Sequence, residues 1–123
     1  MYRIFNHLHE KILLFLFLIF FTSAANSQTT YYSYIGLQDN PWNDPNTWTT
    51  TVNGTDSENP AVPSDGDYVY IVGNRNIVLT SNVVTTGLTI IIESGSSLTL
   101  EGYEFTGGIL KLEGQGRLRI SHS

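Results

Sequence analysis

The stretch between Val69 and Ile120 decides the fold, because three parts of it repeat one pattern. The first reads Val-Tyr-Ile-Val-Gly-Asn-Arg-Asn-Ile-Val-Leu (residues 69–79), the second Ile-Ile-Ile-Glu-Ser-Gly-Ser-Ser-Leu-Thr-Leu (90–100) and the third Leu-Lys-Leu-Glu-Gly-Gln-Gly-Arg-Leu-Arg-Ile (110–120). The copies begin at residues 69, 90 and 110, so the spacing between them is nearly constant. A fixed period of this length is typical of architectures that stack one repeat on the next.

Within each copy, an aliphatic-x-aliphatic pair is followed by a run of turn residues and then by a second such pair. Residues two apart in a strand share a face, so we expect both pairs to point inward. The expected inward columns are Val69/Ile90/Leu110, Ile71/Ile92/Leu112, Ile77/Leu98/Leu118 and Leu79/Leu100/Ile120. The pattern predicts an all-β fold, a short right-handed parallel β-solenoid of about three coils. The alternative is an antiparallel meander, which also combines short strands with glycine turns.

Outside the repeats, the chain divides into three segments. Residues 1–27 combine basic residues, the apolar run Ile12–Phe21 and the small residues Ser23-Ala24-Ala25, a pattern that indicates a signal peptide. Residues 28–66 hold all four prolines and many aromatic residues, so we expect an irregular capping segment there. Residues 67–123 should form the coils. No polar cap follows Ile120, and we therefore expect the stack to be truncated at its C-terminal end, as a fragment of a longer protein.

Composition narrows the possible partners. Without residues 1–27, four basic and ten acidic residues remain, and this acidic balance argues against nucleic acid and against anionic membranes. The chain has no cysteine, so neither a disulfide nor a lipid-carrying cysteine is available. We expect a secreted protein, extracellular or on the cell surface, with no membrane contact after the signal is cleaved.

The aromatic segment supplies the candidate binding residues. Trp42 and Trp48 lie close to Asp39 and Asp44, and flat rings beside carboxylates suit the stacking and hydrogen bonding of sugars. These four residues are the predicted ligand-binding set, with an extracellular polysaccharide as the ligand. The competing interpretation is structural. In it, both tryptophans cover the outward column that contains Tyr70 and Ile91.

Other polar groups carry weaker hypotheses. Asp65-Gly66-Asp67 could hold calcium, although turn chemistry also explains both carboxylates. Glu93 and Glu113 should stack at adjacent corners, where an acid–base pair is the alternative to two solvated side chains. The last coil carries three basic residues, which could contact an acidic polysaccharide or simply be solvated: Lys111, Arg117 and Arg119. We therefore predict no catalytic residue, no metal site and no cofactor.

Two motifs resemble a known family. The segment from Trp42 to Trp48, followed by Pro63 to Ile71, is similar to the opening of the extracellular domain named for its eight glycines. The run from Leu88 to Leu100 is similar as well, and modules of this kind begin large secreted surface proteins of the Bacteroidota. The resemblance implies a β-helical, non-catalytic module that is often found in proteins handling polysaccharide.

The expected function is a secreted structural or binding module of a cell-surface or adhesin-like protein, associated with carbohydrate. Its partners would be polysaccharide and further coils of the same or a longer chain. The alternative is the N-terminal part of a β-helical polysaccharide lyase or hydrolase whose active cleft lies in downstream coils. An acidic outward cluster in those coils would favour the enzyme.

Overall fold

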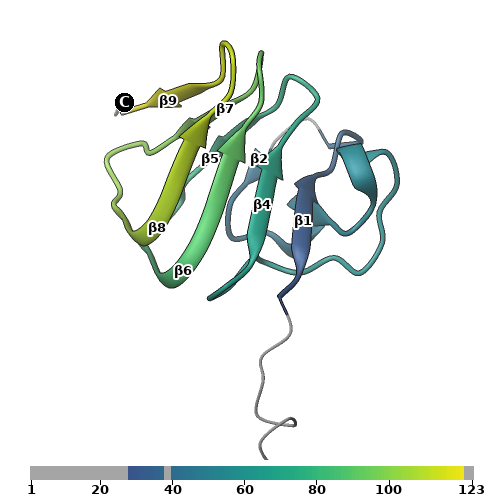
Figure 1. The fold of residues 1–123 in the computed structure, drawn as a ribbon, viewed down its shortest axis with the longest axis horizontal. Helices are drawn as coiled ribbons and strands as arrows, with labels where there is room; N and C mark the ends of the chain where they lie inside the picture. Colours follow the sequence, from purple (N-terminus) through teal and green to yellow (C-terminus); the bar gives the residue numbers. More distant parts are fainter. Residues whose placement is uncertain (1–27, 38–39, 121–123) are drawn as a thin grey trace, which may run out of the picture.

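The computed structural model describes residues 28–37 and 40–120, and strands dominate it (Figure 1). The predicted all-β class is confirmed, because the only helical elements in the described part are two short 3₁₀ turns. The predicted signal peptide (1–27), Asp39 and the segment 121–123 lie outside the described residues. The elements are β1 (Thr30–Ser33), β2 (Asn40–Pro41), η1 (Pro45–Thr47), β3 (Trp48–Thr49), η2 (Val52–Gly54), β4 (Tyr68–Ile71), β5 (Asn76–Val78), β6 (Val83–Ile92), β7 (Ser97–Thr99), β8 (Phe105–Leu112) and β9 (Arg117–Arg119).

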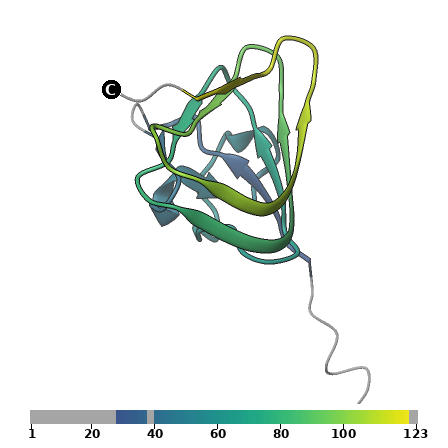
Figure 2. The same ribbon diagram turned by 90° about the vertical axis from the view of Figure 1, so that its left-hand side faces the viewer.

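The strands form two sheets, and the chain alternates between them from β4 onward. The first sheet has the order β3-β1-β4-β6-β8 and the second has the order β2-β5-β7-β9. All pairings are parallel except that of β1 with β3. The two sheets are separate in the described residues and do not make a closed solenoid. In Figure 2, seen from the end that carries β8 and β9, successive passes of the chain overlie one another.

The strand register follows the repeat. Val69 pairs with Ile90 and Ile90 with Leu110, while in the second sheet Ile77 pairs with Leu98 and Leu98 with Leu118. The alignment of the three copies is therefore confirmed in both sheets, and the antiparallel meander is excluded for β4 to β9. Parallel strands need long connections, which here pass through the other sheet.

The segment 28–66 contributes strands to both sheets. β1 pairs in parallel with β4, and β2 pairs in parallel with β5. Ser33 fixes the end of β1 to the end of β4, because its hydroxyl donates to the carbonyl of Val72 (3.0 Å) and accepts from the Val72 amide (2.8 Å). β3 then turns back against β1 and ends the first sheet. This proline-rich segment therefore takes part in both sheets through short strands, and turns and loops make up the rest of it.

Two glycines of the connections lie close to the neighbouring pass of the chain. Gly95 has a φ of +87°, and a Cβ there would collide with Oδ1 of Asn74 in the preceding corner. Gly107 has a φ of +84°, and a Cβ would collide with the carbonyl oxygen of Thr85. Gly107 lies where the register between β6 and β8 shifts, opposite the extra residues of the β6 bulge. Gly107 requires glycine because the obstacle is backbone, whereas at Gly95 the obstacle is a side-chain atom and the positive φ is what favours glycine.

Burial divides the inward columns into two parts. The aliphatic residues of the first two repeats are in the core, except that Leu100 is only partly buried. Those of the third repeat are exposed: Leu110 39%, Leu112 53%, Leu118 37% and Ile120 70%. The interior of the stack is therefore uncovered beside β8 and β9.

Thr99, on the outer face of β7, is more buried than the alternation predicts. The alternation predicts that Thr99 lies outside with solvent around it, but Thr99 is only 3% exposed. Its column places it between Val78 and Arg119, and its hydroxyl donates to Oδ1 of Asn76 (2.6 Å). Neighbouring passes therefore bury outward residues of a middle strand as well as inward ones.

Two substitutions on β6 test the assignment of faces. Ile92→Asp should abolish the cooperative unfolding transition at room temperature or lower stability by several kcal/mol, because an unpaired carboxylate would enter the core. Val84→Asp, at a side chain that is 77% exposed, should change stability by less than about 1 kcal/mol. Urea titrations followed by circular dichroism measure both, and equal midpoints would contradict the assignment.

Candidate functional site

The two tryptophans form an aromatic plug inside the fold. Trp42 is 1% exposed and Trp48 is 0% exposed, with ring centroids 4.9 Å apart in an edge-to-face arrangement. The indole nitrogen Nε1 of Trp48 donates to the carbonyl of Trp42 (2.9 Å), so its one polar atom is satisfied. The ring of Trp42 also meets that of Phe105 edge-to-face at 5.5 Å. The rings belong to the core that includes Val69 and Ile71.

This placement is incompatible with sugar stacking by either tryptophan in the described conformation, because neither ring has an exposed face. It also corrects the location expected for a structural role. Tyr70 on the outer face is covered by Tyr32, whose ring stacks on it at 5.1 Å with an interplanar angle of 13°. The reason is the pairing of β1 with β4, which places Tyr32 directly beside Tyr70. The tryptophans therefore fill the inside, and tyrosines extend the outer column.

Asp44 does not form a ligand site with the tryptophans, because it serves as a cap. Asp44 caps η1, where its Oδ1 accepts from the amide of Asn46 (2.9 Å). That role is local turn chemistry, which aspartate performs well. Asp39 lies outside the described residues, so its place in the predicted set is undefined.

Asp65 and Asp67 are also used by the backbone. Oδ1 of Asp65 accepts from the amide of Thr86 (2.9 Å). The buried carboxylate of Asp67 accepts from the amides of Thr29 (3.1 Å) and Ser64 (2.9 Å). The pair therefore links the turn before β4 to the segment leading into β1 and to β6. Among residues 28–37 and 40–120, no three of histidine, cysteine, aspartate and glutamate gather in a group that could hold a metal ion.

Asp67 acts on its neighbour Tyr31 as well. Burial raises the pKa of the Tyr31 hydroxyl above its usual value of 10, and the negative charge of Asp67 raises it further. Both effects disfavour the phenolate. Tyr31 is therefore held in its neutral form at the start of the first sheet.

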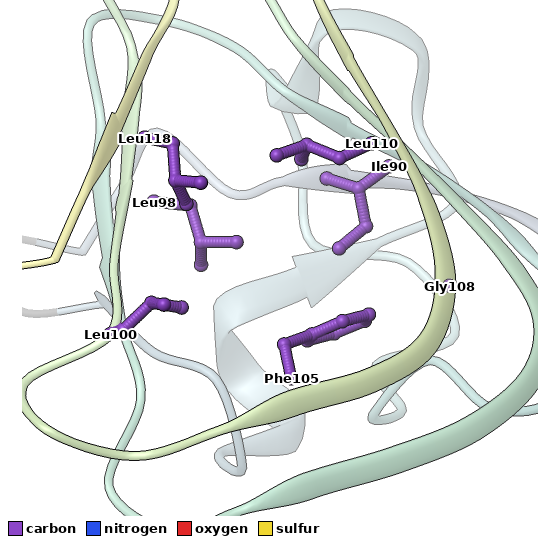
Figure 3. A pocket seen from close by; sticks show the side chains of 7 residues that line it. All are labelled: Ile90, Leu98, Leu100, Phe105, Gly108, Leu110 and Leu118. Carbon is purple, nitrogen blue, oxygen red and sulfur yellow. The ribbon is translucent and has the colours of Figure 1, made fainter.

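A pocket lies at the uncovered end of the stack (Figure 3). Its volume is about 170 Å³, and apolar side chains dominate its lining. Leu98, Leu100 and Leu118 lie on one side of it, and Ile90 and Leu110 lie on the other. Phe105 and Gly108 complete the wall. We call this region the open end: the edge strands β8 and β9 with Leu110, Leu112, Leu118 and Ile120. The sequence predicted an exposed apolar end here, with further coils of the same or a longer chain as partners.

Basic residues alternate with the aliphatic residues on the same two strands. Lys111 lies between the inward residues of β8, and Arg117 and Arg119 flank Leu118 on β9. All three are exposed. Glu93 and Glu113 occupy the neighbouring corners, and no ion pair joins either of them to the three cations in the described part of the chain.

No helix within the described ranges is long and apolar enough to cross a membrane. Comparison of the sequence with protein-family models finds no match, and comparison with curated proteins and with solved structures finds none either. The features of the fold that bear on function are therefore the two ends of the stack, of which one is covered and one is open.

Truncating Trp48 tests the aromatic plug. Trp48→Ala should lower the free energy of unfolding by about 3–5 kcal/mol, since a fully buried aromatic residue leaves a large cavity. Tyr68→Ala, at a side chain that is 38% exposed, should cost much less. In the unmodified protein, acrylamide should quench tryptophan fluorescence weakly. Ready quenching in the folded state would contradict the plug.

The ionisation of Tyr31 predicts a loss of stability in alkali. The pKa of the Tyr31 hydroxyl is raised in the folded state. The stability that Tyr31 contributes is therefore fully present below pH 10 and is lost as the pH rises above 10 through the raised value. Melting temperatures measured from about pH 9 to about pH 11 should therefore fall less steeply for Tyr31→Phe than for the unmodified protein. Identical slopes would show that Tyr31 ionises as freely in the fold as outside it.

Proposed function

We propose that this protein is an exported, non-catalytic structural module that begins a right-handed parallel β-solenoid of a cell-surface or adhesin-like protein. The observation that carries the proposal is the difference between the two ends of the stack. One end is covered by its own chain, and the other presents two strand edges and an apolar interior. A module of this shape closes a solenoid at one end and receives further coils at the other.

The covered end is built from polar and aromatic groups of residues 28–66. The edge strand β2 ends at Pro41, which has no amide hydrogen to offer a further strand. β3 is only two residues long and runs antiparallel to β1. The hydroxyl of Thr49 holds the loop beyond β3, because it accepts from the amide of Glu58 (2.9 Å) and donates to the carbonyl of Asp56 (2.7 Å). These are devices that blunt an edge against further pairing.

The alternation of strands between two parallel sheets supports the solenoid. Each pass from β4 to β9 uses one copy of the repeat, and each inward aliphatic residue lies beside an aliphatic residue of the next pass. Solenoids obtain their stability from contacts of this nearest-neighbour kind. Export is supported by the leader-like residues 1–27, and the resemblance to extracellular modules suggests the surface location. Association with polysaccharide would then belong to the parent assembly and not to Trp42 or Trp48.

An added coil tests the proposal. A second copy of residues 80–100 is placed directly after Ile120, where the repeat pattern would continue. If the open end is a template for coils, the added strands pair with β8 and β9, and the edge amides of these two strands exchange hydrogen about tenfold more slowly or slower still. The melting temperature should rise by about 4 °C or more.

The control is the same extension with its four inward residues replaced by serine, which are the copies of Ile90, Ile92, Leu98 and Leu100. It adds the same length of chain without the aliphatic columns, so it should give neither protection nor a higher melting temperature. If the aliphatic and serine extensions behave alike, the open end does not receive coils and the proposal fails.

A further inference from the structure

Among the described residues, β8 and β9 each have a strand neighbour on one side only. Their outer edges carry backbone amides and carbonyls with no strand opposite them. An edge of this kind accepts an extended polypeptide as an additional strand. The same addition would cover exposed aliphatic side chains of the open end, because Leu110 and Leu118 line the pocket that the next strands would close.

The outer face of this edge has a distinct charge. Of the four basic residues between residues 28 and 123, three lie on the two edge strands, namely Lys111, Arg117 and Arg119. Neither β8 nor β9 contains an acidic residue. The fourth basic residue, Arg75, donates through its guanidinium to the carbonyl of Ile35 and lies just before β5, away from the edge in the sheet order. A protein with an acidic balance therefore concentrates its positive charge on the two strands, β8 and β9, whose outer edges are free to pair.

This charge disfavours a second copy of the chain as the occupant. Two copies can meet through their open ends only with their edge strands antiparallel. If Leu118 of each copy faces the interior, Arg117 of one copy lies opposite Arg119 or Arg117 of the other. Like charges directly opposite each other in a sheet are destabilising. Head-to-tail addition is blocked as well, because the other end of the stack finishes at Pro41 and at the antiparallel β3.

We infer that the open end binds a protein segment of opposite charge pattern, with aliphatic residues facing inward and carboxylates facing outward beside Lys111, Arg117 and Arg119. The segment forms a strand, a corner and a second strand, like the repeats it extends. The inference rests on the proposed function and adds the chemistry by which the correct neighbour is selected. Aliphatic burial supplies the affinity, and the three cations supply the discrimination.

Two peptides of equal length test the inference. The first copies residues 110–120 with K111E, R117E and R119E, and the second copies the same residues unchanged. The purified protein is titrated with each labelled peptide, and binding is followed by fluorescence anisotropy. We expect the acidic peptide to bind at least about tenfold more tightly than the unchanged one at low salt. The difference should shrink at about 0.5 M salt, where exposed charges are screened.

The matched control reverses the charges of the protein. The variant K111E/R117E/R119E alters only exposed side chains and should keep the circular dichroism spectrum of the unmodified protein. It should prefer the unchanged, basic peptide over the acidic one. Equal binding of both peptides, or binding of neither, would overturn the inference. A dimer of the unmodified protein at the same concentration, with the amides of β8 and β9 protected from hydrogen exchange, would overturn it too, because a second copy would then occupy the end.

Failure of this inference can be distinguished from failure of the proposed function. The extension by residues 80–100 carries no charged residue in the positions that would face Lys111, Arg117 and Arg119, because the corresponding residues are Ile91, Ser97 and Thr99. Protection of β8 and β9 by that extension, together with equal binding of both peptides, would leave the coil-receiving role intact. It would remove only the selection by charge.

Discussion

Parallel pairing at a nearly constant offset is the constraint on which the rest of the structure depends. Once Val69 lies beside Ile90, and Ile90 beside Leu110, every inward residue of one pass must meet the inward residue of the next. The corners are then forced to stack, which brings the side chain of Asn74 in the first corner close to Gly95 in the second. The outward columns follow as well, and the position of the basic residues on the last two strands is a consequence of the same register.

The two ends of the stack differ in how far the chain covers the apolar interior. At the first end, the chain folds two tryptophans inward, and the carbonyl of Trp42 satisfies the only polar group of the Trp48 side chain. Short edge strands, a proline and the Thr49 hydroxyl keep further strands away. At the other end, the leucines beside β8 and β9 have no such cover in the described residues. The hydrophobic effect acts equally at both ends, so the difference lies in which end the chain itself covers.

Local patterns could predict the repeats, because alternation and period determine which residues share a face and which strands are neighbours. The same patterns predicted the exposed aliphatic end. They could not predict where Trp42 and Trp48 lie, since a segment without periodicity carries no information about which surface it covers. Tyr32 has no repeat partner in the sequence, and only the pairing of β1 with β4 brings it onto Tyr70. The burial of Thr99 likewise depends on neighbouring passes. The three cations were recognised on the last coil, but their relation to two free edges required the sheet order.

The separation in sequence between paired strands has a consequence for the order in which the fold can form. The pairing of Thr30 with Tyr68 requires the whole proline-rich segment between them to close as a loop. The pair of β2 with β5 spans a similar separation, whereas the pairs between successive repeats join strands that lie only one repeat apart. A ribosome releases the amino terminus first, so the slowest closure involves the part of the chain that appears earliest. Every subsequent pass then meets a finished surface and requires only a short loop to close. When the chain pairs in the order of its synthesis, the longest loop closures thus come first, and each added repeat closes a loop of only one repeat length.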